Sequence, residues 1–120
     1  MFVLLVEDDP LIQGVLADCL QEAGFDTETA RTAEEALEIV EHKKDELRLL
    51  ITDIRIDSAD GKTGWDVAQY ARQISPELPS IHMSGDSAFE RQSNALPDSI
   101  FMMKPFRIAT LLDLLAKVIS

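Results

Sequence analysis

The feature of this sequence that most constrains its fold is the alternation of short apolar runs with stretches of helical periodicity. Five short runs are typical of buried strands, at residues 2–6, 25–30, 47–53, 79–83 and 100–103. Each is followed by apolar residues at helical spacing, within 10–23, 33–40, 67–74, 87–94 and 108–119. This alternation predicts an α/β domain, a doubly wound five-stranded parallel sheet with five helices on its two faces and right-handed crossovers.

Local signals mark the starts of two of these helices. Asp9 followed by Pro10 predicts an N-cap and a first turn. Thr32 and Glu35 have the spacing of a capping box. The stretch 87–94 has few apolar anchors, so its helix is the weakest of the five predictions and is expected to be the most mobile.

The net charge restricts the partners of the chain. Twenty-two acidic side chains against eleven basic ones give a net charge of -11. Such a charge repels nucleic-acid phosphates and anionic lipids alike. We therefore expect no direct contact with nucleic acid or with a membrane.

Length and cysteine content set further limits. A chain of 120 residues fits one domain, residues 1–120, with a substantial core. Cys19 is the one cysteine, and its neighbours Val15, Leu16 and Leu20 predict that it packs on the core-facing side of the first helix. No signal peptide is visible, and no apolar stretch approaches the length of a membrane span. These features predict a cytoplasmic protein.

Polar side chains follow four of the five predicted strands. In open parallel sheets, sites form beyond the carboxyl ends of the strands, so these side chains are expected to converge. They are Glu7, Asp8, Asp53, Ser84 and Lys104. Crowded carboxylates require a cation, and oxygen ligands favour Mg²⁺. A lysine and a hydroxyl beside that metal suit an anionic group in transfer. Helix capping is the alternative for each residue, but Lys104 does not suit a helix N-terminus.

Four short segments together carry a specific resemblance. They are VLLVEDDP at 3–10, LITD at 50–53, MSG at 83–85 and MKPF at 103–106. Because these segments occur in this order and with this spacing, the chain resembles the receiver domain of a two-component response regulator along essentially its whole length. The resemblance implies a flavodoxin-like strand order of 2-1-3-4-5. It also implies a role in signal transduction through an aspartyl phosphate.

The resemblance assigns the central role to Asp53. It implies that the Asp53 carboxylate attacks the phosphorus of a phosphohistidine donor. Glu7 and Asp8 would form the acid pair around Mg²⁺, with Asp53 and the backbone carbonyl of Arg55 as further ligands. Lys104 would pair with a phosphoryl oxygen. The same site would support hydrolysis of the phosphoryl group by water, so the chain would dephosphorylate itself without turning over external substrates.

The resemblance also implies a switch and a control of phosphoryl lifetime. Ser84 would move toward the phosphoryl group, and Phe101 would turn into the space behind it, although Phe101 is equally explained as an ordinary apolar strand residue. Arg55 and Asp86 lie two residues beyond Asp53 and Ser84, at positions that border the phosphoryl group in this family. Opposite charges there would pair across the mouth of the site and screen it from water.

The loop 54–64 departs most from the family pattern. Ile56 and Asp57 occupy the positions of a customary Met-Pro pair, and Gly64 fits the start of the third helix, so this loop is expected to be longer than usual. Trp65 is interpreted as a packing residue at that helix start, with a partner-binding anchor as the alternative. His82 is interpreted as a strand histidine satisfied by its neighbours rather than as a second phosphoryl carrier.

The expected partners follow from the resemblance. The phosphodonor would be a sensor histidine kinase or a histidine phosphotransfer protein. A downstream protein would bind through the fourth helix, the last strand and the last helix. The chain is expected to be a stand-alone receiver, although a receiver excised from a hybrid kinase would have the same sequence features. Two other functions stay open. One is a phosphorylation-independent interaction module with a relic site, and the other is an aspartate-nucleophile phosphatase, for which Arg55 replaces the usual second Asp.

Overall fold

The computed structural model describes residues 1–85 and 99–119. Its centre is a parallel sheet of five strands in the order β2-β1-β3-β4-β5. The strands are β1 (Phe2–Val6), β2 (Asp26–Ala30), β3 (Leu47–Asp53), β4 (Ser80–Ser84) and β5 (Ile100–Met103). The predicted α/β class and the strand order implied by the resemblance are both confirmed.

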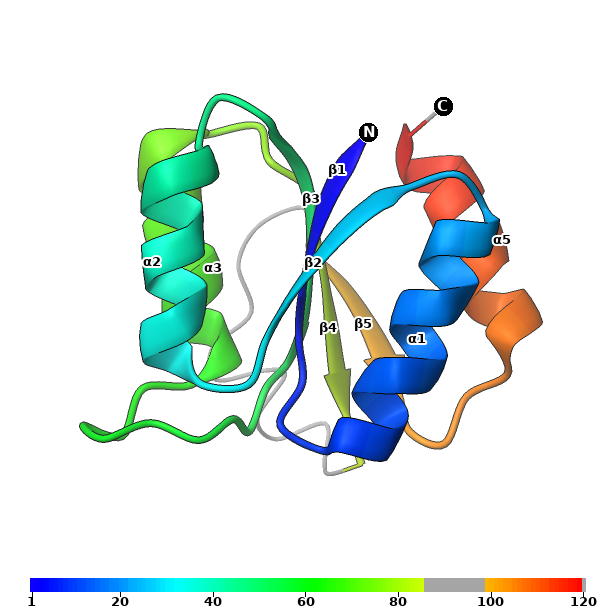
Figure 1. Cartoon of the computed structure of the whole chain (residues 1–120), viewed down its shortest axis with the longest axis horizontal. Coiled ribbons are helices and arrows are strands. Elements are labelled where there is room, and N and C mark those ends of the chain that lie inside the picture. The colour runs from blue at the N-terminus through cyan, green and yellow to red at the C-terminus, as the bar shows by residue number, and fades with distance from the viewer. Residues whose placement is uncertain (86–98, 120) are drawn as a thin grey trace.

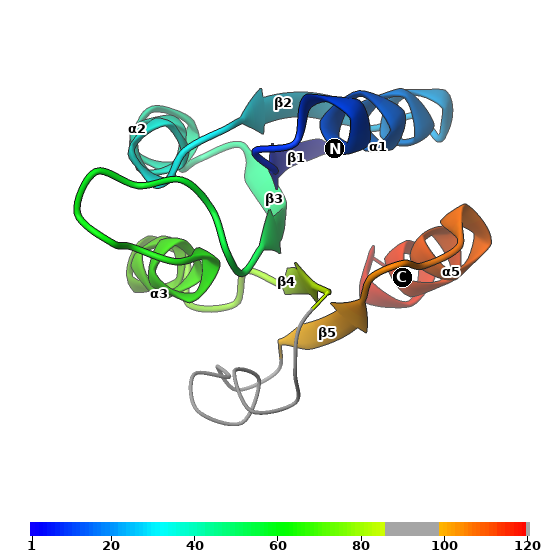
Figure 2. The same ribbon diagram turned by 90° about the horizontal axis from the view of Figure 1, so that it is seen from below.

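Four helices lie within the described residues. They are α1 (Pro10–Glu22), α2 (Ala33–Lys43), α3 (Gly64–Ile74) and α5 (Ile108–Ile119). Helices α2 and α3 cover one face of the sheet, and α1 and α5 cover the other (Figures 1 and 2). The helix expected at residues 87–94, with its proposed role in partner binding, lies outside the described residues.

Each face of the sheet carries its own apolar layer because successive strand residues point to opposite sides. Leu4 and Leu50 lie in the layer between the sheet and helices α2 and α3. Leu5 and Ile51, one position further along the same strands, lie in the layer beneath α1 and α5. Both central strands are therefore buried on both faces, and their carboxyl ends are held firmly at one edge of the sheet.

The strand bounds agree closely with the sequence predictions. β1, β3 and β5 begin and end at the predicted residues, while β2 begins at Asp26 rather than at Phe25. β4 runs from Ser80 to Ser84, one residue later than predicted. Ser84 is therefore the last residue of the strand, in register with Met103 of β5, and not the first residue of the loop.

The two predicted helix starts are confirmed, one of them with a different bond. The Asp9 carboxylate accepts hydrogen bonds from the backbone of the first turn of α1, and Pro10 opens the helix. The Thr32 hydroxyl accepts from Glu35 N at 3.1 Å, as a capping box requires. The Glu35 carboxylate, however, accepts from Arg31 N at 2.9 Å, so the returning bond reaches one residue further upstream than predicted.

One face of α1 was predicted wrongly. Leu16 and Leu20 are buried against the sheet, but Val15 is 56% exposed, Leu11 is 80% exposed and Cys19 is only half-buried. The helical period explains the difference, since Leu11 and Val15 are four residues apart and share a side of the helix turned away from the core. This leaves an apolar strip on the surface beside the carboxyl edge of the sheet.

Within residues 1–85 and 99–119, no helix combines the length and the apolar character needed to cross a bilayer.

Candidate functional site

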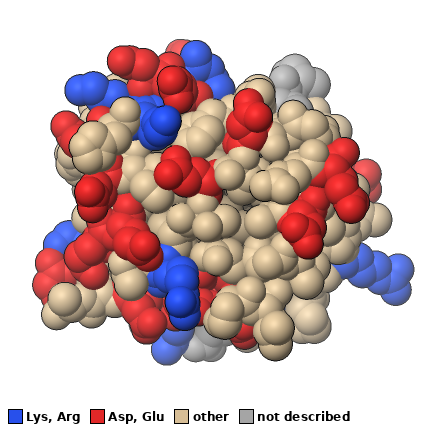
Figure 3. Space-filling view, viewed as in Figure 1, with Lys and Arg blue, Asp and Glu red and all other residues tan. Residues whose placement is uncertain are grey.

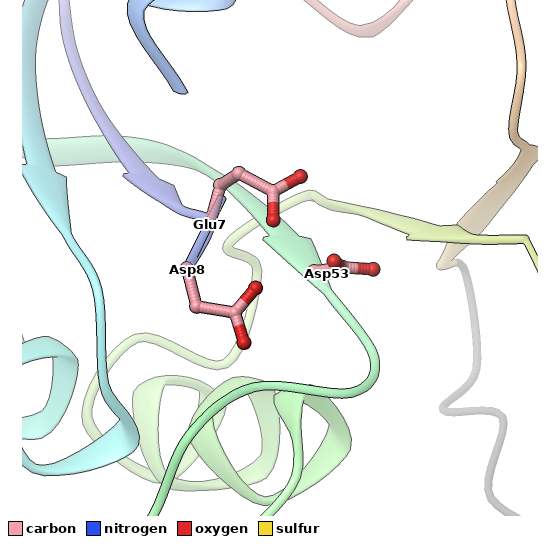
Figure 4. A group of neighbouring side chains, drawn as sticks. All are labelled: Glu7, Asp8 and Asp53. Carbon is pink, nitrogen blue, oxygen red and sulfur yellow. The ribbon is translucent and has the colours of Figure 1, made fainter. Parts of the chain in front are cut away.

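Three carboxylates meet at the carboxyl edge of the sheet. Glu7 and Asp8 directly follow β1, and Asp53 is the last residue of the neighbouring strand β3 (Figure 4). One oxygen from each of the three lies within 4.8 Å of the others. Glu7 is fully buried and Asp53 nearly so, while Asp8 is half-buried. The predicted convergence of these acids is confirmed.

Lys104 joins this cluster from the segment that follows β5. Its ammonium lies 2.6 Å from Glu7 Oε1 and 2.9 Å from Asp53 Oδ2, and its side chain is largely buried. One cation thus bridges two carboxylates, and each contact is a charge-assisted hydrogen bond. Lys104 N also donates to the Ser84 carbonyl at 2.8 Å, which ties the lysine backbone to the end of β4.

The charges of the cluster are only partly balanced. Burial raises the pKa of Glu7, and the Asp53 charge adds to this effect, although the Lys104 hydrogen bond opposes it. Burial raises the pKa of Asp8 as well, and both Glu7 and Asp57 add to the effect. Burial alone lowers the pKa of Lys104, but its hydrogen bonds to Glu7 and Asp53 outweigh this and raise it. Three acids beside one base therefore favour an additional cation.

The donor set fits the Mg²⁺ that the resemblance implies. Glu7, Asp8 and Asp53 offer only oxygen atoms, and Mg²⁺ prefers carboxylate oxygens with water in its remaining positions. The half-buried Asp8 leaves the cluster open to water. Arg55 lies exposed just beyond β3, and the role of its carbonyl as a ligand stays a prediction.

The remaining predicted residues have different outcomes. Ser84 is buried at the end of β4, the strand beside β3, so its position next to Asp53 follows from the sheet order. Phe101 is half-buried on β5 and pairs in register with His82. Asp86 lies outside the described residues. The roles in switching and phosphoryl lifetime stay predictions.

Two residues that position the site were missed from the sequence. Gln13 Nε2, on α1, donates to the Glu7 carbonyl at 3.1 Å and to the Ala30 carbonyl at 3.3 Å. It therefore fixes the backbone of a candidate metal ligand against the end of β2. Gly64 is the second: it begins α3 as predicted, but its approach to the site was missed, since a Cβ at this residue would lie 2.1 Å from the Asp53 carbonyl oxygen. Only a glycine permits α3 to begin this close to the end of β3.

The long loop 54–64 is held by specific contacts. Ser58 Oγ donates to Glu34 Oε2 at 2.8 Å, and Ala59 N donates to Glu34 Oε1 at 3.2 Å. Asp60 pairs with Lys62, and its Oδ1 lies 2.8 Å from the same Ser58 Oγ. The one hydroxyl proton of Ser58 is therefore shared between Glu34 and Asp60. These contacts attach the loop to the start of α2, and they direct the Asp60 carboxylate to the loop itself rather than to the metal cluster.

His82 and Trp65 form an aromatic pair inside the α3 side of the sheet. Their ring centroids lie 3.8 Å apart with planes at 25°, and both side chains are buried. His82 Nε2 lies 3.0 Å from Ser80 Oγ. His82 is fully buried and therefore not accessible to a phosphodonor, which agrees with its interpretation as a strand histidine; Ser80 satisfies its Nε2, while its Nδ1 has no partner among the described residues.

This fold and this cluster together define a class. A parallel sheet of order 2-1-3-4-5 that carries an acid pair after β1, an aspartate after β3 and a lysine after β5 is the architecture of a two-component receiver domain. Residues 3–116 match the response regulator receiver domain family. The chain belongs to this family.

Individual relatives agree with the family. The chain is 32% identical over 111 residues to the sensor kinase CckA of Brucella abortus, covering 91% of this chain and 11% of that protein. It is 30% identical over 115 residues to the response regulator protein PilR of Pseudomonas aeruginosa, covering 94% of this chain and 25% of that protein. The chain thus spans a quarter or less of the length of these relatives.

Solved structures give the same result. A response regulator receiver protein from Sinorhizobium medicae is 31% identical with a TM-score of 0.91, covering 98% of this chain and 93% of that chain. The receiver domain of the hybrid histidine kinase CckA is 28% identical with a TM-score of 0.84, and the match covers 100% of both chains.

Proposed function

We propose that this receiver accepts a phosphoryl group on Asp53 from a phosphohistidine of a sensor histidine kinase or a histidine phosphotransfer protein. The observation that carries the proposal is the bridge of Lys104 between Asp53 and Glu7 at the edge of a three-carboxylate cluster. The support is proximity: one oxygen from each of the three carboxylates lies within 4.8 Å of the others, and Lys104 contacts two of them, as expected of a nucleophile, a fixed cation and metal ligands. Each of these is a requirement of phosphoryl transfer.

The transfer is a displacement at phosphorus. An Asp53 carboxylate oxygen forms the new P–O bond, the P–N bond of the donor breaks, and its electron pair returns to the imidazole nitrogen. Lys104 holds Asp53 Oδ2, so we assign the attack to Oδ1. Mg²⁺, bound by Glu7, Asp8, Asp53 and the Arg55 carbonyl, would supply positive charge for the phosphoryl oxygens. Lys104 then pairs with one phosphoryl oxygen, and the Ser84 hydroxyl donates to another.

The same site returns to its resting state by hydrolysis. Water attacks the phosphorus of the aspartyl phosphate, the P–O bond to Asp53 breaks, and phosphate leaves. Arg55 is exposed two residues beyond Asp53, and together with Asp86 it is proposed to limit the access of this water. An Arg55→Ala variant is expected to change the half-life of the phosphoryl group, and an unchanged half-life would contradict this role.

The proposed output is a change of surface. Ser84 ends β4 beside Asp53, and Phe101 lies on the adjacent strand β5. Movement of Ser84 toward the phosphoryl group is proposed to let Phe101 turn inward, which alters a protein-binding surface that includes β5 and α5. Phosphorylation shifts this equilibrium by its differential affinity for the two forms.

The phosphodonor protein is proposed to dock beside the cluster. A groove of about 650 Å³ lies between the N-terminal half of α1 and the segment after β5, and it borders Lys104. Exposed Leu11 and Val15 line it, and the part of the surface over this half of α1 is largely uncharged (Figure 3). Leu11→Asp is expected to slow transfer from a kinase but not from a small phosphodonor, which never contacts the groove.

One experiment tests the function directly. The protein is incubated with acetyl phosphate and Mg²⁺, and its intact mass is measured. The wild type is expected to gain one phosphoryl group, Asp53→Asn none, and Asp60→Asn as much as the wild type because Asp60 is engaged within its loop. Failure of the wild type to gain mass would instead favour a phosphorylation-independent interaction module. Undiminished labelling of Asp53→Asn would place the acceptor elsewhere.

A further inference from the structure

The stacked pair of His82 and Trp65 has no part in the proposed chemistry, yet it occupies a central place. The two rings lie 3.8 Å apart at their centroids, nearly parallel, and both are buried. Ser80 Oγ lies 3.0 Å from His82 Nε2 and fixes the orientation of the imidazole. The pair is therefore a rigid contact between β4 and the start of α3.

Trp65 is connected to Asp53, the proposed phosphoacceptor, through its neighbour Gly64. The residue before it, Gly64, donates its N–H to the Ile54 carbonyl at 2.7 Å. The Gly64 backbone also approaches the Asp53 carbonyl so closely that a Cβ would lie 2.1 Å from the oxygen. Trp65 is thus bonded directly to a residue whose backbone lies close to the Asp53 carbonyl.

His82 lies on the same strand as the Ser84 hydroxyl, two residues before it. Alternate residues of a strand point to one face, so Ser80, His82 and Ser84 share the α3 side of β4. In register, His82 lies between Thr52 of β3 and Phe101 of β5. The imidazole is therefore adjacent along the strand to Ser84 and adjacent across the sheet to the candidate switch residue.

Both rings of the pair carry a buried ring nitrogen. Among the described residues, neither Trp65 Nε1 nor His82 Nδ1 has a hydrogen-bond partner, although both atoms are buried. An unsatisfied buried polar atom destabilises a fold, and apolar side chains of the same shape avoid that cost.

We propose that the stack of His82 on Trp65 is a positioning unit for phosphoryl transfer, holding the Ser84 end of β4 in place relative to Asp53. The inference rests on the proposed function, because the two rings are proposed to keep the groups that take part in phosphoryl transfer in position. His82 and Trp65 are positioning residues, since both act through neighbours of the reacting atoms. Movement of Ser84 toward the phosphoryl group changes the overlap of the two rings.

Trp65 provides a direct readout in the unaltered protein, because it is the only tryptophan of the chain. Indole emission depends on the groups in contact with the ring. Addition of acetyl phosphate and Mg²⁺ is expected to change Trp65 emission with the same time course as the gain of phosphoryl mass. Asp53→Asn, treated in the same way, is expected to show no such change.

Two substitutions at His82 separate positioning from packing. His82→Ala removes the stack and is expected to slow phosphoryl uptake about tenfold, because small misplacements of reacting groups are costly. His82→Phe keeps a stacked ring and is expected to stay within about twofold of the wild type. Leu78→Ala is the matched control, since Leu78 is buried in the same layer but precedes β4, at the end remote from Ser84. It is expected to lose stability without losing rate.

The outcomes distinguish this inference from the proposed function. Phosphoryl uptake by the wild type without any change in Trp65 emission would overturn the positioning role alone. Equal slowing of His82→Ala and Leu78→Ala would overturn it too, because the effect would then come from general loss of packing. If His82→Ala does not fold, the Trp65 emission of the wild type on phosphorylation still tests the positioning role. No uptake by the wild type would overturn the proposed function, and this inference with it.

Discussion

Removal of the buried histidine is expected to change how the stability of the protein depends on pH. Burial lowers the pKa of His82 from 6.5 to about 3, and the positive charge of Arg72 adds to this effect. The folded chain therefore keeps the imidazole neutral at pH values where the unfolded chain protonates it. The contribution of His82 to stability is complete above pH 6.5 and is lost progressively as the pH falls toward 3.

The magnitude follows from these two values. One pKa unit corresponds to about 1.4 kcal/mol. Between about pH 7.5 and about pH 5, the unfolded chain gains the proton and the folded chain does not, so the free energy of unfolding falls by about 2 kcal/mol on account of this residue. Glu7 and Asp8 act in the opposite direction, because their pKa values are raised in the fold.

The assay is urea unfolding of the wild type and of His82→Phe at a series of pH values. Phenylalanine keeps the ring on Trp65 but takes up no proton, and it leaves the acids unchanged, so the difference between the two curves isolates His82. We expect the stability advantage of the wild type to shrink by about 2 kcal/mol on acidification over this range. His42→Gln, at an exposed position of α2, is measured alongside as a second histidine substitution.

Parallel curves for the wild type and His82→Phe would refute the reasoning. They would mean that the imidazole takes up a proton in the folded chain as readily as in the unfolded one, which a fully buried ring stacked on an indole does not permit. A larger pH dependence in His82→Phe would refute it as well.

Three further outcomes are expected. Gly64→Ala should lower the free energy of unfolding by about 1–3 kcal/mol and slow phosphoryl uptake, whereas Gly14→Ala, whose Cβ meets nothing within 4 Å, should raise it by about 0.5–1 kcal/mol. Urea unfolding measures both. Gln13→Ala should weaken Mg²⁺ binding in a titration, because the Glu7 backbone loses its bond to α1, and unchanged affinity would contradict this. Lys104→Met should show a larger rise in Tm with Mg²⁺ than the wild type, since the metal replaces the lost charge; an equal rise would contradict it.

Both the strands of the sheet and the charged residues at the centre of the site could be predicted from the sequence, because both depend on where the apolar runs begin and end. Apolar runs define strands through their own composition, and a polar residue at a strand end lies at a known edge once the strands are parallel. Asp53, Asp8 and Lys104 were found in this way, without knowledge of any contact. The acid pair and the lysine lie together because the fold brings strand ends together, whatever the loops between them do.

Contacts that depend on a specific partner were not predictable in this way. Whether Val15 is buried depends on which side of α1 faces the sheet. The apolar pattern of α1 did not decide whether Val15 or its neighbour Leu16 lies at the centre of that side. The stack of His82 on Trp65 joins two residues whose sequence neighbours give no indication of each other. The approach of Gly64 to Asp53 required the path of the whole loop between them, which the sequence showed only as polar.

The bridge made by Lys104 also has a consequence for folding. Its partner Glu7 is 97 positions away in the sequence, and Asp53 is 51 positions away. Such distant contacts form late, after the loops between them have been closed. A chain that is still being synthesised, or one that is clipped before β5, holds its acids without the lysine that completes their site. Under the proposed function, a chain would therefore need to be folded through β5 before its site is complete.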